Sequence, residues 1–365
     1  MHAVQYGAAV CLLVLAATAP APAANIAPQK ATASADGKTL WYNCKDLLVE
    51  GKGWTDTDWF YSRLPTKAQG RVIQPVWDLS HQSAGISVRF MANTSSVQVR
   101  WTLTNEKNLS MPHMPDTGAS GIDLYAKDKD GRWRFVGNGR PDAGTNTAQF
   151  APASGQPCLL YFPLYNGVAS AEIGIPKEST MSVPDASTLS KPIVFYGTSI
   201  TQGGCASRPG MAATAIVGRR LDVPVINLGF SGCGVMEQSM AELMAELDAS
   251  AYVLDCLWNM VPTGVAERTE PFVKALRRTH PDTPIWLVED SSVWGFCPTA
   301  KGIALREVYK KLTADGMKNV YFLSNEGMLG DDTEGTVDGT HLTDLGMMRQ
   351  AETFIKAISS HKKPQ

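Results

Sequence analysis

Five residues in the C-terminal half of the chain are of the types that acyl transfer requires. Ser199 can act as a nucleophile, His341 as its base, and Asp338 as the group that orients the imidazole ring. A serine hydroxyl is a poor nucleophile unless a base contacts it, and an imidazole titrates close to neutral pH. The N–H groups of Ser199 and Gly232 and the side-chain amide of Asn259 can donate to a developing oxyanion. These residues predict attack by a serine on a carbonyl carbon, with Asp338 and His341 carried by one loop or helical turn.

The candidate residues follow apolar segments that alternate with helix-length segments. The apolar segments cover residues 193–196, 225–228, 252–254, 285–288 and 320–323, and the helix-length segments cover residues 211–221, 236–247, 265–279, 302–314 and 345–358. Near-continuous apolar strands that alternate with helices predict a parallel sheet with helices on both faces. Ligands of such sheets bind beyond the carboxyl ends of the strands, so we expect the candidate residues to meet at one edge of the sheet.

The N-terminal half has a different pattern, made of short runs in which polar and apolar residues alternate. Residues 86–90 and 97–101 alternate with period two, and Asp130 and Gly131 between two further runs are typical of a hairpin turn. No helical stretch is indicated in this region. The predicted division is an all-β sandwich over residues 41–177, a linker rich in Ser, Thr and Pro over residues 178–191, and an α/β domain over residues 192–365.

The C-terminal segments resemble the blocks of the SGNH hydrolases, also called GDSL-type hydrolases. Ser199 lies in a Gly-Thr-Ser-Ile block that corresponds to the family's Gly-Asp-Ser-Leu, Gly232 lies in the second block, and Asp338 and His341 form an Asp-x-x-His block. The third block, Leu-Trp-Asn-Met, keeps only Asn259 of the usual Gly-x-Asn-Asp. The resemblance implies a three-layer, flavodoxin-like α/β hydrolase domain. It also implies a Ser-His-Asp mechanism with an oxyanion hole formed by Ser199, Gly232 and Asn259.

Residues 121–125 read Gly-Ile-Asp-Leu-Tyr, which is similar to the signature of a small β domain that precedes some esterases of this family. Relatives with this layout resemble carbohydrate esterases, so we expect hydrolysis of a short acyl ester, acetyl above all, on a glycan or a small molecule. The alternatives are a lipase or thioesterase acting on other acyl esters, and a non-catalytic glycan-binding protein. The loops expected beside Ser199 are small or polar, and only Trp258 and Met260 add bulk beside Asn259, which favours a short acyl group. Neither a metal nor an organic cofactor is implied.

Composition restricts the partners and the compartment. The 33 Lys and Arg residues nearly balance 35 Asp and Glu residues, for a formal net charge of -2, which argues against a nucleic-acid partner. An apolar run over residues 8–19, followed by small residues and prolines, predicts a signal peptide over residues 1–24. The run is shorter than the ~20 residues that span a bilayer. We therefore expect export to the periplasm or the medium without a stable membrane span. The oligomeric state is left open.

Six cysteines follow Cys11, and their spacing does not determine a pairing. Cys205 follows the Ser199 segment and Cys233 adjoins Gly232, so we expect one of them to form a disulfide that fixes a loop of the site.

Other residues near these motifs are open to two interpretations. Arg208 either lines the substrate pocket or, in better agreement with its position, braces the loop after Ser199. Asp123 is interpreted as a turn or strand-edge residue, and His113, which has no partner motif, as structural or exposed. The aromatic residues between positions 54 and 61 are interpreted as core or interface rather than as a platform for a sugar.

Overall fold

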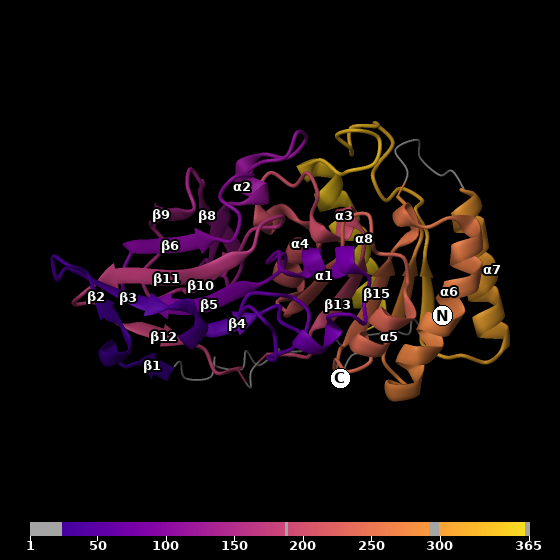
Figure 1. Ribbon diagram of the computed structural model, residues 1–365, viewed down its shortest axis with the longest axis horizontal. Coiled ribbons are helices and arrows are strands. Elements are labelled where there is room, and N and C mark those ends of the chain that lie inside the picture. The colour runs from indigo at the N-terminus through magenta and orange to yellow at the C-terminus, as the bar shows by residue number, and fades with distance from the viewer. Residues whose placement is uncertain (1–23, 187–188, 292–298, 362–365) are drawn as a thin grey trace, which may run out of the picture.

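The computed structural model describes residues 24–186, 189–291 and 299–361, and it contains a β-rich region and an α/β region side by side (Figure 1). The predicted signal peptide, except for Ala24, lies outside the described residues. Within the described ranges, no helix combines the length and the apolar character that a membrane crossing requires.

The β-rich region consists of two antiparallel sheets. The larger sheet has the order β1 (Ala24–Ile26), β12 (Met181–Val183), β5 (Ser87–Ala92), β10 (Pro157–Tyr161), β7 (Ile122–Lys127) and β8 (Trp133–Gly139), and β4 (Leu48–Glu50) also pairs with β5. The second sheet has the order β2 (Thr32–Ala33), β3 (Thr39–Asn43), β11 (Val168–Pro176), β6 (Val97–Leu103) and β9 (Thr145–Phe150). Side chains of both sheets, among them Phe90, Trp101 and Leu124, meet in one buried cluster. The period-two pattern of the sequence therefore buries one face of each sheet against the other.

Two features of this region differ from the expectation drawn from the sequence. The helices α1 (Gln74–Ser80) and α2 (Asp116–Ala119) interrupt the strands, and both are too short to display a helical repeat of apolar residues. The strand β12 lies within the segment predicted as a linker, where it pairs with both β1 and β5. The chain thus returns to the larger sheet before it enters the α/β region.

The α/β region is built on a parallel sheet. Its order is β14 (Val225–Gly229), β13 (Ile193–Gly197), β15 (Ala251–Asp255), β16 (Ile285–Val288) and β17 (Val320–Leu323). Counted along the chain this order is 2-1-3-4-5, which is the flavodoxin-like arrangement. The helices are α3 (Ser199–Gln202), α4 (Ala213–Leu221), α5 (Gln238–Met244), α6 (Pro262–Thr279), α7 (Ala300–Ala314) and α8 (Asp344–His361). Short 3-10 turns occur at η1 (Pro28–Lys30), η2 (Cys44–Asp46), η3 (Thr66–Ala68), η5 (Pro209–Met211) and η6 (Leu257–Asn259).

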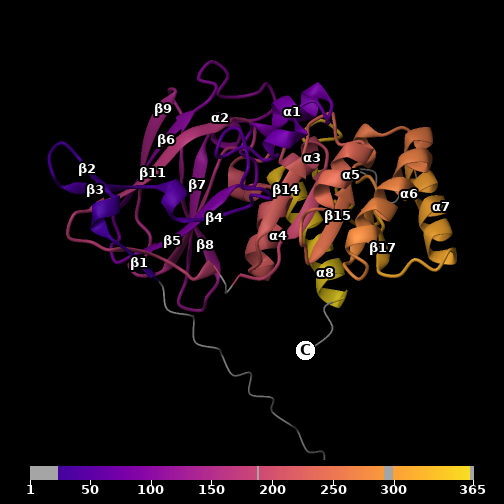
Figure 2. The ribbon, with the colours of Figure 1, turned by 60° about the horizontal axis from the view of Figure 1, so that its bottom comes forward.

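Helices cover both faces of the parallel sheet (Figure 2). Tyr196 of β13 belongs to a buried cluster with residues of α5, α6 and α7, whereas its neighbour Phe195 belongs to a second cluster with residues of α4 and α8. This alternation follows from the pleat of the strand, and it gives three layers. Val76 of α1 joins the first cluster and Tyr125 of β7 joins the second, so the β-rich region packs against the α/β region through shared core.

Candidate active site

Ser199, His341 and Asp338 form a continuous chain of hydrogen bonds at the carboxyl edge of the parallel sheet. Ser199 is the first residue of α3, directly after β13, and is 7% exposed. Its Oγ lies 2.9 Å from His341 Nε2, and His341 Nδ1 lies 2.8 Å from Asp338 Oδ2. These are hydrogen-bond distances. The sequence therefore brings together a hydroxyl, a base and an orienting carboxylate from positions 142 residues apart.

A tight turn before α8 explains why three residues separate the carboxylate from the imidazole. Asp338 Oδ1 accepts hydrogen bonds from the backbone N–H groups of Thr340 at 3.0 Å and His341 at 2.7 Å, while Oδ2 faces the imidazole. Gly339, within the turn, has a φ of +86°, which favours glycine. Partial burial alone would raise the pKa of Asp338, but the hydrogen bonds from His341 and Thr340 outweigh it and lower this pKa to about 2. The Asp338 carboxylate is therefore ionised at neutral pH, where it has to orient the imidazole ring of His341.

Gly232 and Asn259 meet beside this chain because their strands flank β13. Gly197 of β13 is in register with Gly229 of β14 and with Asp255 of β15, so all three following loops begin at the same level. We orient the Asn259 amide with Oδ1 toward the backbone N–H groups of Gly232, Cys233 and Gly234, which lie at 3.3, 3.1 and 3.3 Å. This orientation leaves both Nδ2 hydrogens available to another acceptor.

A glycine that the sequence analysis did not single out makes this loop possible. A Cβ at Gly234 would lie 1.9 Å from the carbonyl oxygen of Gly197, two residues before Ser199. No side chain fits there, so Gly234 allows the loop after β14 to approach the nucleophile. Gly232 itself has a φ of +73°, and a Cβ there would meet nothing within 4 Å. Backbone conformation rather than space is therefore the reason for glycine at position 232.

The disulfide predicted for Cys205 or Cys233 is wrong for the described residues. Both are free thiols, as are Cys44, Cys158 and Cys256, while Cys297 lies outside the described residues. Burial raises the pKa of Cys205 to about 11, so this residue is a neutral thiol and not a competing nucleophile. Hydrogen bonds and ion pairs hold the loops of the site instead.

The β-rich region holds the loop that follows the nucleophile. Arg208 Nη1 lies 2.8 Å from Asp123 Oδ2 and also donates to the hydroxyl of Tyr125. The backbone N–H of Gly210 lies 3.0 Å from each oxygen of Asp123, which is fully buried. Arg208 therefore braces the loop, as its position indicates. Asp123 is not the turn or strand-edge residue that the sequence suggested, because it lies within β7 and anchors the loop across the boundary between the two regions.

Two further residues of the β-rich region reach the site, and neither was identified from the sequence. The ring of His113 lies 5.2 Å from the ring of His341 in a T-shaped arrangement. The hydroxyl of Tyr165 donates to the carbonyl oxygen of Ser199 at 3.3 Å. Neither residue belongs to a motif, and both contacts depend on how the two regions pack. No pattern in the sequence could have indicated them.

The bulky residues beside Asn259 are fixed in place. Trp258 Nε1 donates to Ser291 Oγ at 3.1 Å, and Lys301 Nζ lies 4.6 Å from the centre of the indole ring. Met260 is 7% exposed.

In the N-terminal aromatic group, Trp54 packs against the core, but Trp59 is 49% exposed and stacks edge-on with His81. The interpretation of that group as core or interface therefore holds for Trp54, Phe60 and Tyr61, which lie in or against buried clusters, and not for Trp59.

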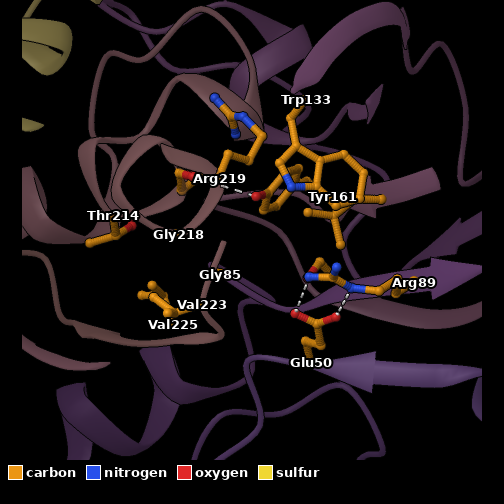
Figure 3. Close-up of a pocket in the computed structure, with 13 residues that line it drawn as sticks. Glu50, Gly85, Arg89, Trp133, Tyr161, Thr214, Gly218, Arg219, Val223 and Val225 are labelled. Carbon is orange, nitrogen blue, oxygen red and sulfur yellow. Dashed lines mark hydrogen bonds and ion pairs between the residues drawn. The ribbon is translucent and has the colours of Figure 1, made fainter. Parts of the chain in front are cut away.

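A separate cavity lies where the two regions meet (Figure 3). Its lining includes the ion pair of Glu50 with Arg89, as well as Trp133, Tyr161 and Arg219. Its volume of about 20 Å³ accommodates roughly one water molecule, so it is too small for an acyl group or a sugar.

Comparisons with known proteins agree with this fold. The GDSL-like lipase/acylhydrolase family matches residues 190–359, and the Gly-x-Asp-Leu-Tyr domain, described as the N-terminus of SGNH hydrolase-type esterases, matches residues 39–181. A crystal structure described as a GDSL-like lipase from Bacteroides ovatus is 35% identical, with a TM-score of 0.81, over 88% of this chain and 97% of that one. The chain therefore belongs to the GDSL-like lipase/acylhydrolase family.

More distant structures share the fold. The salicylyl-acyltransferase SsfX3 from a tetracycline biosynthetic pathway is 19% identical, with a TM-score of 0.70, over 86% of this chain and 94% of that one. A family two carbohydrate esterase from Cellvibrio japonicus is 14% identical, with a TM-score of 0.58, over 88% of this chain and 97% of that one. A search of curated proteins found no match.

Proposed function

We propose that the protein is an exported serine esterase that hydrolyses short acyl esters, acetyl esters above all, with a carbohydrate ester as its natural substrate. The observation that carries this proposal is the hydrogen-bonded chain from Ser199 through His341 to Asp338, with Asn259 and Gly232 on the neighbouring loops. Membership of the family supports ester hydrolysis as the reaction class.

The reaction follows from the geometry. Ser199 Oγ attacks the ester carbonyl carbon while its proton passes to His341 Nε2, and Asp338 stabilises the imidazolium that forms. The carbonyl oxygen becomes an oxyanion, which accepts hydrogen bonds from Asn259 Nδ2 and from the N–H group of Ser199. The N–H of Gly232, expected from the sequence to donate as well, faces Asn259 Oδ1 instead and holds that amide in place. The C–O bond breaks, and the leaving alcohol takes the proton from His341. Water then attacks the acyl-enzyme by the same route in reverse, which releases the carboxylic acid and the free Ser199 hydroxyl.

The short acyl group is supported by the surroundings of Asn259. Ser291 and Lys301 pin Trp258, and Met260 is buried, so neither side chain is free to open a groove. A pocket gains about 0.8 kcal/mol per buried CH₂ only where it has room for the added carbon. We expect kcat/KM to be highest for acetyl among the acetyl, butyryl, octanoyl and palmitoyl p-nitrophenyl esters. A kcat/KM that rises with chain length would favour the alternative, a lipase.

The proposed carbohydrate substrate and the proposed export are each supported by a different observation. Solved structures with the same fold include family two carbohydrate esterases, two of them from Clostridium thermocellum described in complex with cellohexaose. The apolar run over residues 8–19 supports export. The balanced charge supports a neutral glycan rather than a polyanion.

Acetate release from acetylated polysaccharides tests the proposal. The wild-type protein, Ser199→Ala and the control Ser96→Ala, a serine in the turn between β5 and β6, would be incubated with a panel of acetylated polysaccharides. We expect acetate from at least one polysaccharide with the wild type and with Ser96→Ala, and none above background with Ser199→Ala. Equal release by Ser199→Ala would contradict the assignment of the nucleophile.

A further inference from the structure

A histidine from the β-rich region and a buried cysteine stand beside the proposed catalytic base. His113, Cys205 and His341 each offer one ligand atom, and these three atoms lie within 4.8 Å of one another. The three residues come from the loop between β6 and α2, the loop after α3, and the turn before α8. Two imidazoles and one thiolate are ligands that Zn²⁺ prefers.

His341 already has the hydrogen bond that metal-ligating histidines use. Such a histidine binds the metal through one ring nitrogen and donates the other N–H to a carboxylate, which fixes its tautomer. Nδ1 of His341 faces Asp338 at 2.8 Å, so Nε2 is the nitrogen that can carry a lone pair toward a cation. This same nitrogen faces Ser199 Oγ.

The side chains of His113 and Cys205 are held in place by their loops, and both are free to bind a metal. His113 is on a closed turn in which the backbones of Met111 and Met114 exchange hydrogen bonds of 3.0 and 3.1 Å. Within the described part of the chain, no hydrogen bond to its ring nitrogens is found. Cys205 is a free thiol, 6% exposed, and its loop is held by Thr117, whose hydroxyl donates to the carbonyl oxygen of Ser207 at 2.6 Å. The β-rich region therefore fixes both His113 and the loop of Cys205.

The separation of the ligand atoms is close to that of a bound zinc site. Zn–N bonds of about 2.0–2.1 Å and Zn–S bonds of about 2.3 Å at tetrahedral angles place two ligand atoms roughly 3.3–3.7 Å apart. Because the three ligand atoms lie within 4.8 Å of one another, a contraction of at most about 1.5 Å brings them to these separations. Cys205 is a neutral thiol in the free protein, and binding of the cation displaces its proton. The resulting thiolate and the nearby carboxylate of Asp338 then supply negative charge beside the cation.

We propose that His113, Cys205 and His341 form an inhibitory site for Zn²⁺. The cation binds Nε2 of His341, an imidazole nitrogen of His113 and the Cys205 thiolate, whose proton passes to solvent, and a solvent molecule completes the coordination. His341 can then no longer accept the proton of Ser199, so the bound cation blocks the first step of ester hydrolysis. The metal site stands on its own geometry, whereas the inhibition rests on the proposed function.

Two measurements test this site with Zn²⁺ or Co²⁺ as the probe. The first is titration calorimetry of the purified protein with ZnCl₂ in a non-chelating buffer. The second is the near-ultraviolet absorption of the protein with Co²⁺, in which a thiolate ligand gives a charge-transfer band. We expect one Zn²⁺ per chain, a cobalt–thiolate band, and inhibition of p-nitrophenyl acetate hydrolysis that a chelator reverses.

Substitutions at the proposed ligands identify which side chains bind the metal. Cys205→Ser should abolish the cobalt–thiolate band, and Cys205→Ser and His113→Asn should each weaken Zn²⁺ binding at least about 10–100-fold, because even second-shell changes cost that much. The control His81→Asn, a histidine of the same region that pairs with Asp58, should bind Zn²⁺ like the wild type. If Cys205→Ser does not fold, the Zn²⁺ affinity of His113→Asn, a change on a solvent-accessible turn, still decides whether the metal site exists.

Defined outcomes overturn the proposal. They are an absence of Zn²⁺ binding in calorimetry, or wild-type affinity in either Cys205→Ser or His113→Asn. If the protein hydrolyses no ester, the proposed function fails, yet the calorimetry and the cobalt band still establish or reject the metal site.

Discussion

The α/β region carries the groups proposed to react, whereas the β-rich region holds them in place. Ser199, His341 and Asp338 all lie at the carboxyl edge of the parallel sheet, and their geometry is set by short turns within that region. The β-rich region contributes Asp123, which is buried and binds the loop after the nucleophile, and His113, which stands beside His341. The contrast indicates that the β-rich region is an integral part of the site rather than an appended domain.

The largest effect on activity is expected at the nucleophile Ser199 and its base His341, which the α/β region supplies. Ser199→Ala and His341→Ala each remove a group that forms or breaks bonds, so each should lower kcat for p-nitrophenyl acetate by about 10⁴–10⁶-fold. Circular dichroism and the melting temperature should stay close to the wild type, because neither change creates a large cavity. Turnover within tenfold of the wild type in either variant would remove that residue from the mechanism.

A smaller loss is expected at the oxyanion donor. Asn259→Ala removes the side-chain amide but leaves Ser199 and His341 in place, so kcat should fall about 10²–10³-fold with little change in KM. The same change also removes the acceptor for the loop after β14, so Asn259→Asp serves as the comparison. It keeps that acceptor and replaces the donor with a carboxylate. If Asn259→Asp retained wild-type kcat, Asn259 would act on the loop alone.

The β-rich region is tested by the bond between Asp123 and Arg208. Asp123→Asn keeps an acceptor for Gly210 but removes the charge that holds Arg208, so the loop after Ser199 should shift. Because a displacement of 1 Å can cost about 10²-fold, we expect kcat to fall by roughly 10–100-fold while KM changes less. Asp128→Asn, which breaks ion pairs with Arg132 and Arg134 on an exposed hairpin, should leave kcat unchanged.

Two results would reduce Asp123 to a structural role. One is an activity loss that only parallels the unfolded fraction measured in a thermal melt. The other is an equal loss in Asp128→Asn.

The smallest effect concerns stability and its dependence on pH. Burial raises the pKa of Asp255, at the end of β15, to about 7, and the nearby charge of Asp290 adds to the rise. An unfolded aspartate titrates near pH 3.9. The stabilising contribution of protonated Asp255 is therefore complete below about pH 4 and is lost as the pH rises through about 7.

Asp255→Asn should remove this dependence. The hydrogen bond from Thr201 Oγ1, now 3.1 Å from Asp255 Oδ2, can be kept by the amide oxygen. The melting temperature of the variant should exceed that of the wild type by more at pH 8 than at pH 5, as differential scanning calorimetry would show. A difference in melting temperature that is the same at both pH values would contradict the shifted pKa.

The same contrast separates what the sequence could predict from what it could not. The apolar segments over residues 285–288 and 320–323 correspond residue for residue to β16 and β17. β16 is buried throughout and is read directly as an apolar run, whereas β17 lies at the edge of the sheet and is only partly buried. The candidate site residues were identified for a related reason, since each follows such a strand or precedes the last helix. Their catalytic roles remain predictions, although the geometry brings them together.

The contacts across the boundary between the regions could not be predicted. Asp123 and Arg208 are 85 residues apart, and His113 and His341 are farther apart still, so each pair depends on how two separately patterned regions dock. Short helices such as α1 were missed because seven residues are too few to show a periodic pattern. Sequence patterns thus describe elements, while the packing between elements decides the surroundings of the site.

Covalent labelling tests the central claim most directly. A p-nitrophenyl dialkyl phosphate reacts with a serine only when a neighbouring base activates that serine, and it leaves one dialkylphosphoryl group that mass spectrometry of peptides can place. We predict a single label on Ser199, formed rapidly in the wild type and very slowly in His341→Ala. Labelling of a different residue, or labelling of Ser199 at the same rate in His341→Ala, would contradict the account.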